Sequence, residues 1–199
     1  MCKITPEEKA RFLALVDQWA GEGLRMIGLA YRTLGRLDDY SGYTWVGLVG
    51  MEDPVREGVV EAIQVAKKAG IQVKMITGDY RLTAEHIART TGLMQSDDQS
   101  MEGPEVAALS DEQLQERVRT ISVFARIRPQ DKLRIIKALQ ANGEIASMIG
   151  DGVNDAPALQ RANIGVVVGS ATDVAKETAD LILLDNNFRT IVAAIEEGR

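Results

Sequence analysis

The chain has 199 residues, of which 45% are hydrophobic and 26% are charged, and its formal net charge is −6. This length suits one ordinary α/β domain with a smaller appendage, and the hydrophobic fraction is that of a globular protein with a core. The acidic balance argues against nucleic acid as a partner, because binding along a phosphate backbone needs dense patches of Lys and Arg.

The cysteine content and the length of the apolar runs indicate in which cellular compartment the chain would be found. Cys2 is the only cysteine, so it has no partner for an internal disulfide or a zinc site, which is typical of a reducing compartment. No run approaches the roughly 18 apolar residues that a membrane helix needs, and the charged start differs from a signal peptide. We therefore expect the isolated chain to be soluble.

The first 52 residues predict a small α+β segment. Residues 5–20 read as a helix, because Thr5 can cap it, Pro6 suits its first position and apolar residues recur on one face. Residues 24–32 and 43–51 read as strands, separated by a polar loop around Asp38, Asp39, Ser41 and Gly42. These elements make only half a domain.

From residue 53 onward, helices and strands alternate. A helix over 55–68 ends at Gly70, and an apolar strand over 71–77 follows. The remaining expected elements are a helix over 80–92, a polar loop near 95–105, a helix over 110–119, strand 121–125, helix 129–142, strands 144–149, 164–168 and 180–184, and a final helix over 188–197. This alternation predicts an α/β fold with a Rossmann-like, mainly parallel sheet and helices on both faces.

Polar residues follow three of the expected strands. They are Thr77-Gly78-Asp79, then Arg126 with Lys132 a little further on, and finally the segment "GDGVND" at 150–155. Taken singly, "TGD" is a common turn and Lys132 is an ordinary solvated charge. In open α/β sheets, however, ligands bind beyond the carboxyl ends of the strands, so the three loops belong together.

Together the three loops describe a phosphate site. The Thr77 hydroxyl and nearby backbone amides can hold phosphoryl oxygens, and Lys132 can neutralise developing charge. Carboxylates of 150–155 can hold Mg²⁺, while the glycines between them let a phosphate approach the backbone. The sequence therefore predicts phosphate chemistry that depends on Mg²⁺.

Four stretches in this order resemble a known family: "MEDPVRE", "MITGD", "FARIRPQDK" and "IGDGVNDAPAL". They look like the cytoplasmic region of P-type cation-transporting ATPases, whose phosphorylation domain belongs to the haloacid dehalogenase superfamily. The resemblance runs across essentially the whole chain. The stretch "GLRMIGLAYR" is further similar to the late nucleotide-domain segment of the type II pumps.

The resemblance implies roles for individual residues. Asp151 would be the Mg²⁺ ligand, Lys132 would neutralise the phosphate, and Thr77, Gly78 and Asp79 would contact the phosphoryl group and its nucleotide. Asn154 and Asp155 would order the surroundings of the metal and the phosphate. Asp151 and Lys132 are both expected to face an accessible cleft rather than the core.

The resemblance also divides the chain and places the ATP site. Arg25, Arg56 and Arg126 would reach the nucleotide together with Asp79. Residues 1–52 would form the C-terminal part of the nucleotide-binding domain, 53–56 the hinge, and 57–199 the phosphorylation domain.

The phosphorylated "DKTGT" segment of the family has no counterpart in this sequence. Without that aspartate no aspartyl phosphate forms, so we expect the isolated chain to be inactive. The first part of the nucleotide domain, the actuator domain and the membrane helices are also missing. The chain therefore reads as the C-terminal part of the soluble catalytic region of a membrane pump, facing the cytoplasm, with the transported cation, ATP and those missing domains as partners.

In the superfamily's sheet, the strand that carries the nucleophile is central, between the strands that end here at Thr77 and Ile149. Its absence would leave buried backbone groups unpaired. We expect the gap to be closed by these two strands, filled by a second copy in self-association, or left loosened.

Two other functions remain open. A free-standing phosphatase of the haloacid dehalogenase type would use the same threonine, lysine and acids, but it needs an aspartate nucleophile ahead of "MITGD", and none fits. A non-catalytic regulatory or binding module derived from a pump explains the missing nucleophile. Such a module has no evident use for Lys132 and Asp151.

Overall fold

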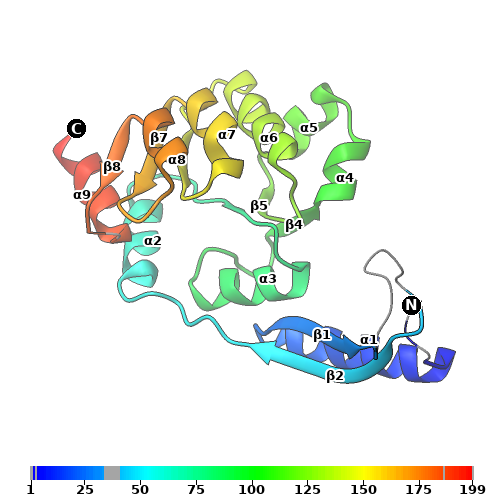
Figure 1. Cartoon of the computed structure of the whole chain (residues 1–199). Coiled ribbons are helices and arrows are strands. Elements are labelled where there is room, and N and C mark those ends of the chain that lie inside the picture. The colour runs from blue at the N-terminus through cyan, green and yellow to red at the C-terminus, as the bar shows by residue number, and fades with distance from the viewer. Residues whose placement is uncertain (1, 3, 34–40, 186, 199) are drawn as a thin grey trace.

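The computed structural model describes residues 2, 4–33, 41–185 and 187–198, and its arrangement is shown in Figure 1. The helices are α1 (Pro6–Gly21), α2 (Val59–Lys68), α3 (Arg81–Thr90), α4 (Gly103–Ala108), α5 (Asp111–Arg117), α6 (Pro129–Ala141), α7 (Ala156–Arg161), α8 (Asp173–Thr178) and α9 (Phe188–Glu197), with a 3₁₀ turn, η1, at Val153–Asp155. The strands are β1 (Arg25–Tyr31), β2 (Thr44–Met51), β3 (Met75–Ile76), β4 (Gln99–Glu102), β5 (Ile121–Ala125), β6 (Ser147–Gly150), β7 (Ile164–Val168) and β8 (Leu181–Leu183). None of the described helices combines the length and the apolar character that a membrane span requires.

The parallel strands form two separate three-stranded sheets, in the orders β3-β5-β4 and β6-β7-β8. Parallel pairing between strands that alternate with helices confirms the predicted α/β fold class. The expected single sheet is nevertheless divided into two, because β3 and β6 do not pair with each other. Each of them is an edge strand, and no described strand pairs with its free edge. The predicted gap is thus present and remains open.

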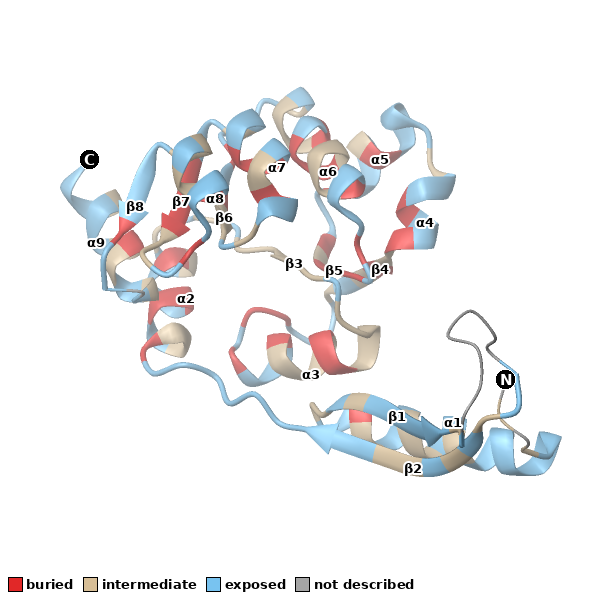
Figure 2. Ribbon diagram, viewed as in Figure 1, coloured by how far each residue is buried: buried red, intermediate tan, exposed pale blue. Residues whose placement is uncertain are grey.

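Helices cover both faces of each sheet, as Figure 2 shows by the buried residues along the strands and the inner sides of the helices. On one face of the first sheet, Phe124 of β5 packs among apolar residues of α4, α5 and α6. On the other face, Val123 and Ala125 pack against α2 and α3. In the second sheet, Val167 faces α7 and α8, whereas Val166 faces α9.

The N-terminal elements form a separate layer in which α1 packs against the antiparallel pair β1-β2. Thr5 and Glu8 form a capping box at the start of α1, which confirms the predicted cap. The Phe12 and Trp45 rings lie 5.0 Å apart between helix and sheet. Residues 52–57 follow as an exposed linker without helix or strand, and the expected turn residues Asp38 and Asp39 lie outside the described residues.

Three expectations about the elements were wrong. The polar stretch near 95–105 contains β4 and the start of α4, because pairing with β5 holds a strand whose only buried apolar residue is Met101. The helix expected from residue 55 begins at Val59, after Gly58 turns the chain with φ +83°. The strand expected over 71–77 is reduced to β3. Helices α7 and α8 were not expected.

Candidate functional site

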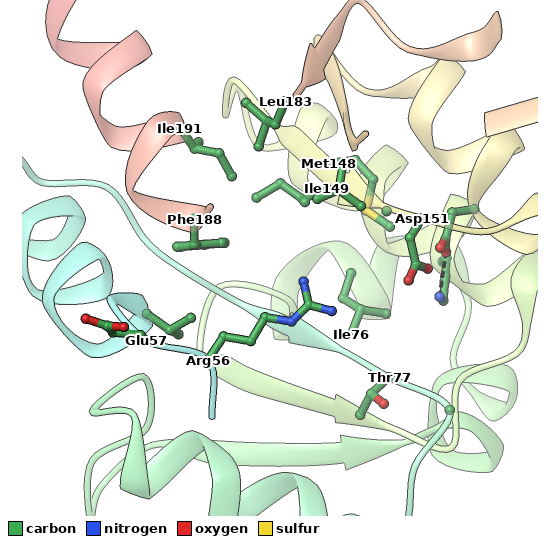
Figure 3. A pocket seen from close by; sticks show the side chains of 16 residues that line it. Arg56, Glu57, Ile76, Thr77, Met148, Ile149, Asp151, Leu183, Phe188 and Ile191 are labelled. Atoms are coloured by element: carbon green, nitrogen blue, oxygen red, sulfur yellow. Dashed lines mark hydrogen bonds and ion pairs between the residues drawn. The ribbon is translucent and has the colours of Figure 1, made fainter. Parts of the chain in front are cut away.

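One pocket of about 390 Å³ lies between the unpaired edges of the two sheets, at the ends of β3 and β6 (Figure 3). Its polar lining consists of Arg56, Glu57, Thr77, Gly78, Lys132, Gly150, Asp151 and Asp155. Its apolar lining consists of Val59, Ile76, Met148, Ile149, Val168, Leu183, Phe188 and Ile191. The pocket is therefore an apolar groove with charged residues at the strand ends.

The turn after β3 is closed by its own side chains. The Thr77 hydroxyl donates to Asp79 Oδ2 at 2.9 Å and accepts the Asp79 backbone N–H at 3.1 Å. The turn is joined to the next strand end, because Arg126 N–H donates to the Asp79 carbonyl and Ile127 N–H to the Thr77 carbonyl, both at 2.9 Å. These bonds fix the backbone that presents Thr77 and Gly78 to the pocket.

A short ion pair in the pocket joins α6 to η1. Lys132 Nζ donates to Asp155 Oδ1 at 2.6 Å, and the two side chains are only 15% and 10% exposed. Gly150 permits this arrangement, since a Cβ there would lie 2.7 Å from the Asp155 Cβ. Lys132 lines the pocket, as expected of a residue that faces a cleft, but its side chain is only 15% exposed because Asp155 holds it inward.

Asp151 and Asn154 are both exposed, as their places in the loop after β6 allow. The Asp151 carboxylate lines the pocket, while its backbone carbonyl accepts the Thr172 N–H at 3.1 Å. Asn154 does not line the pocket. Over the described residues, no three His, Cys, Asp or Glu side chains gather into a group that could hold a metal alone.

The three arginines assigned to the nucleotide lie in different places. Arg56 reaches into the pocket from the linker. Arg25 on β1 lies outside the pocket lining, and its side chain is 71% exposed. Its Nε lies 3.7 Å from Asp79 Oδ1. Arg126 is exposed, and its guanidinium carbon lies 5.3 Å from the centroid of the Tyr80 ring.

The structure thus brings six of the expected site residues to one pocket: Arg56, Thr77, Gly78, Lys132, Asp151 and Asp155. Asp79, Asn154, Arg25 and Arg126 lie outside its lining. Sequence reasoning missed the apolar wall that Phe188 and Ile191 of α9 provide. The amphipathic pattern of that helix was visible, but nothing in it indicated which pocket the apolar face would line.

Comparison with known proteins gives close relatives for almost the whole chain. "Calcium-transporting ATPase 1" of Lactococcus lactis is 44% identical over 203 residues, covering 99% of this chain and 23% of the relative. The human "Calcium-transporting ATPase type 2C member 2" is 46% identical over 198 residues, covering 98% of this chain and 20% of the relative. "Probable cation-transporting ATPase F" of Mycobacterium bovis is 43% identical over 208 residues, covering 98% and 23%.

The chain therefore spans less than a quarter of the length of these relatives. Their names confirm the resemblance to P-type cation-transporting ATPases that the four motifs indicated. A family model described as haloacid dehalogenase-like hydrolase matches residues 8–163, and a second model with the same description matches 132–195. Because the first match covers well over half of the chain, this chain belongs to the haloacid dehalogenase-like hydrolases.

Proposed function

We propose that this chain supplies most of the phosphoryl-transfer site of an ATP-driven cation pump, on the cytoplasmic side of a membrane. One observation carries the proposal: Thr77 after β3, Lys132 on α6 and Asp151 after β6 line the same pocket. The similarity to calcium- and cation-transporting ATPases over nearly the whole chain supports it. The chain would serve the part of the pump's cycle in which the γ-phosphoryl group of ATP is transferred.

Phosphoryl transfer needs positioning and charge stabilisation more than covalent chemistry by the protein. The backbone N–H groups at Gly78 would position phosphoryl oxygens at the end of β3, and the Thr77 hydroxyl would donate to them after turning away from Asp79 Oδ2, to which it donates in this structure. The Lys132 ammonium would balance their negative charge, while Asp155 holds that ammonium in place at 2.6 Å. Both charges of the pair lie in a region of low exposure, where electrostatic interactions are stronger than in water.

Mg²⁺ fits this site as an ion held jointly with phosphate. Magnesium is usually bound through one or two carboxylates, substrate phosphates and water rather than by a full protein cage. The exposed Asp151 carboxylate offers one such ligand at the pocket, whereas Asp155 already accepts a hydrogen bond from Lys132. When bound, Mg²⁺ would supply further neutralisation of the phosphate charge.

The aspartate that receives the phosphoryl group would come from outside the described elements. We propose that an apolar strand followed by "DKTGT" inserts between β3 and β6, where both strand edges lack a partner in the described structure. Ile76, Ile149 and Phe188 would cover its apolar side chains, and its end would reach Lys132 and Asp151. Each buried backbone group that it satisfies would remove a penalty of about 1 to 3 kcal/mol.

The nucleotide would lie between the N-terminal layer and the pocket. Arg25, Arg56, Asp79 and Arg126 would contact it. Arg25 and the Arg126 backbone both lie beside Asp79, and Arg56 lines the pocket. Residues 1–52 would then act as the end of a nucleotide domain and 53–56 as its hinge, with 57–199 as the phosphorylation domain. The exposed linker over 52–57 supports this division.

A peptide containing an apolar strand followed by "DKTGT" tests the proposal. Added to the chain, it should bind, raise the melting temperature and become labelled by the γ-phosphate of ATP in a hydroxylamine-sensitive bond. A scrambled peptide of the same composition should have none of these three effects, and Lys132→Ala should abolish labelling. Lys137→Ala removes the same charge from an exposed site on α6 and serves as the matched control.

Addition of the same peptide also distinguishes self-association, a regulatory or binding module, and a phosphatase. A second copy that occupies the groove would give concentration-dependent association that the peptide reverses. A regulatory or binding module would be a rigid monomer whose high melting temperature the peptide leaves unchanged, and that result would contradict the missing-strand proposal. Phosphatase activity of the chain without peptide would favour the phosphatase instead.

A further inference from the structure

The N-terminal layer is joined to the rest of the chain by the exposed linker over 52–57 and by packing of α1 against α3. Two contacts at this junction involve backbone carbonyls. The Thr83 hydroxyl donates to the Leu24 carbonyl at 3.0 Å, and His86 Nδ1 lies 2.9 Å from the Gly21 carbonyl. These contacts attach the end of α1 to the side of α3, away from the pocket.

A third contact at the junction starts beside the site itself. Tyr80 follows the Thr77-Gly78-Asp79 turn directly and is the N-cap residue of α3. Its hydroxyl donates to Asp17 Oδ1 on α1 at 2.7 Å. The hydrogen bond to the Asp17 carboxylate raises the pKa of the Tyr80 phenol, with burial as a smaller cause in the same direction. The phenol is therefore protonated and donating near neutral pH.

The ring of Tyr80 faces a second partner, the guanidinium of Arg126, whose carbon lies 5.3 Å from the ring centroid. The backbone of Arg126 is held independently of this contact. It is the only described residue other than glycine with a positive φ, +52°, and its N–H donates to the Asp79 carbonyl at 2.9 Å. Gly103 packs against the Arg126 carbonyl so closely that a Cβ there would clash with it.

No carboxylate lies within ion-pair distance of Arg126 in the part of the chain that the structure describes. Within the described residues, the Arg126 guanidinium therefore lies against the Tyr80 ring and not against a carboxylate. A cation over a tyrosine ring at this distance is attracted by the ring's quadrupole. One residue therefore contacts the N-terminal layer through its hydroxyl and the Arg126 guanidinium through its ring.

We infer that Tyr80 is a positioning residue that couples docking of the N-terminal layer to the placement of the Arg126 guanidinium at the strand ends. The hydroxyl stabilises the docked arrangement through Asp17, and the ring holds the Arg126 guanidinium beside Tyr80, the residue that follows the Thr77-Gly78-Asp79 turn. Arg126 would then contact a phosphate or the ribose of a nucleotide, and this part of the inference rests on the proposed function. The coupling itself does not depend on that function.

Two substitutions at the same position separate the two roles. Tyr80→Phe removes the hydroxyl and keeps the ring, whereas Tyr80→Leu removes both. The Nε–Hε resonance of Arg126, assigned by its loss in Arg126→Lys, reports the aromatic ring through its ring-current shift. We expect Tyr80→Phe to keep most of this shift and Tyr80→Leu to abolish it.

Tyr43→Leu is the matched control for the ring, because Arg32 lies 5.1 Å from the Tyr43 ring centroid in the N-terminal layer. It should leave the Arg126 resonance unchanged. An Arg126 resonance that is the same in Tyr80→Leu as in the wild type would overturn the inference.

Docking is measured by the distance between spin labels on Leu13→Cys and Lys137→Cys, in a chain that also carries Cys2→Ser. Both label sites are exposed, and they lie on α1 and α6. Tyr80→Phe and Asp17→Asn should each broaden the distance distribution, with the ratio of undocked to docked chains raised about tenfold. An unchanged distribution in both variants would remove the hydroxyl from the coupling.

Titration with AMP-PCP, a non-hydrolysable ATP analogue, distinguishes failure of this inference from failure of the proposed function. Tyr80→Leu should weaken binding about 2- to 5-fold, while Tyr43→Leu should not. If AMP-PCP leaves the Arg126 resonance of the wild-type chain unmoved, the nucleotide role of Arg126 fails. The ring-current shift of Arg126 and the spin-label distances then test the coupling through Tyr80 independently of nucleotide binding.

Discussion

Lys132 and Asp155 form an ion pair with a distance of 2.6 Å between Nζ and Oδ1, across 23 residues of sequence and with little exposure of either side chain. Removing one partner of such a pair leaves the other charge poorly solvated. We expect Lys132→Ala to lower the free energy of unfolding by about 3 kcal/mol, measured by urea denaturation. The double variant Lys132→Ala/Asp155→Ala should recover part of this loss, and a purely additive cycle would contradict the coupling.

Asp151 lies in the same pocket but is exposed, so its substitution should act on ligands rather than on folding. Asp151→Asn should change the free energy of unfolding by less than about 0.5 kcal/mol. It should weaken the binding of Mg²⁺ with inorganic phosphate, followed by amide resonances of Gly78 and Gly150. Glu116→Gln, an exposed acid on α5, is the control. Mg²⁺ affinity unaffected by Asp151→Asn would remove Asp151 from the metal role.

Gly150 is the position at which the backbone of β6 meets the Asp155 side chain. A Cβ at this position would lie 2.7 Å from the Asp155 Cβ and 2.9 Å from its carboxylate. Gly150→Ala should therefore displace Asp155 from Lys132 and destabilise the chain by about 1 to 3 kcal/mol. Gly78→Ala points a Cβ into open space and should leave stability nearly unchanged. Equal stability of both variants would contradict the close approach.

Docking of the N-terminal layer should depend on pH through Tyr80. Its phenol pKa is raised above the ordinary value of 10.0, and the charged groups around it are Asp17 on α1, Arg126 after β5 and Glu102 at the end of β4. A group with a raised pKa contributes its stabilisation fully below the ordinary value and loses it as the pH rises through the raised value. The spin-label distance should therefore stay narrow at pH 7 to 9 and broaden above about pH 10.

This pH response should belong to the phenol. Tyr80→Phe removes the titrating group, so its distance distribution should be broad already at neutral pH and should not change further between pH 9 and 11. A wild-type chain with the same distribution at both ends of this range would show that the hydroxyl does not control docking.

The isolated chain should have no ATPase activity and should not take up an acid-stable label from the γ-phosphate of ATP. The reason is chemical, because no "DKTGT" aspartate is present to accept the phosphoryl group. Incubation with radiolabelled ATP, acid quenching and hydroxylamine treatment check this expectation. Hydroxylamine-sensitive labelling of the chain itself would reveal a different nucleophile and would contradict the assignment of the inserted strand.

Local signals in the sequence were sufficient for many helices and strands, and they indicated six of the residues that line the pocket. The capping pattern at Thr5, the proline at the start of α6 and the glycine after α2 mark helix ends through bonds within a few residues. The order of the motifs likewise indicated that Thr77, Lys132 and Asp151 belong together. Parallel strands bring their carboxyl ends to one edge of a sheet, so this part of the geometry follows from the fold class.

Contacts between distant residues could not be read in the same way. The partner of Lys132, the proton acceptor of Tyr80 and the pairing that makes a strand of 99–102 depend on residues brought close only when the layers pack. The polar stretch at β4 has no apolar alternation, so its pairing with β5 and the burial of Met101 define it. The open groove between β3 and β6 arises for the same reason, since a strand edge is paired or left free by what packs beside it and not by its own residues.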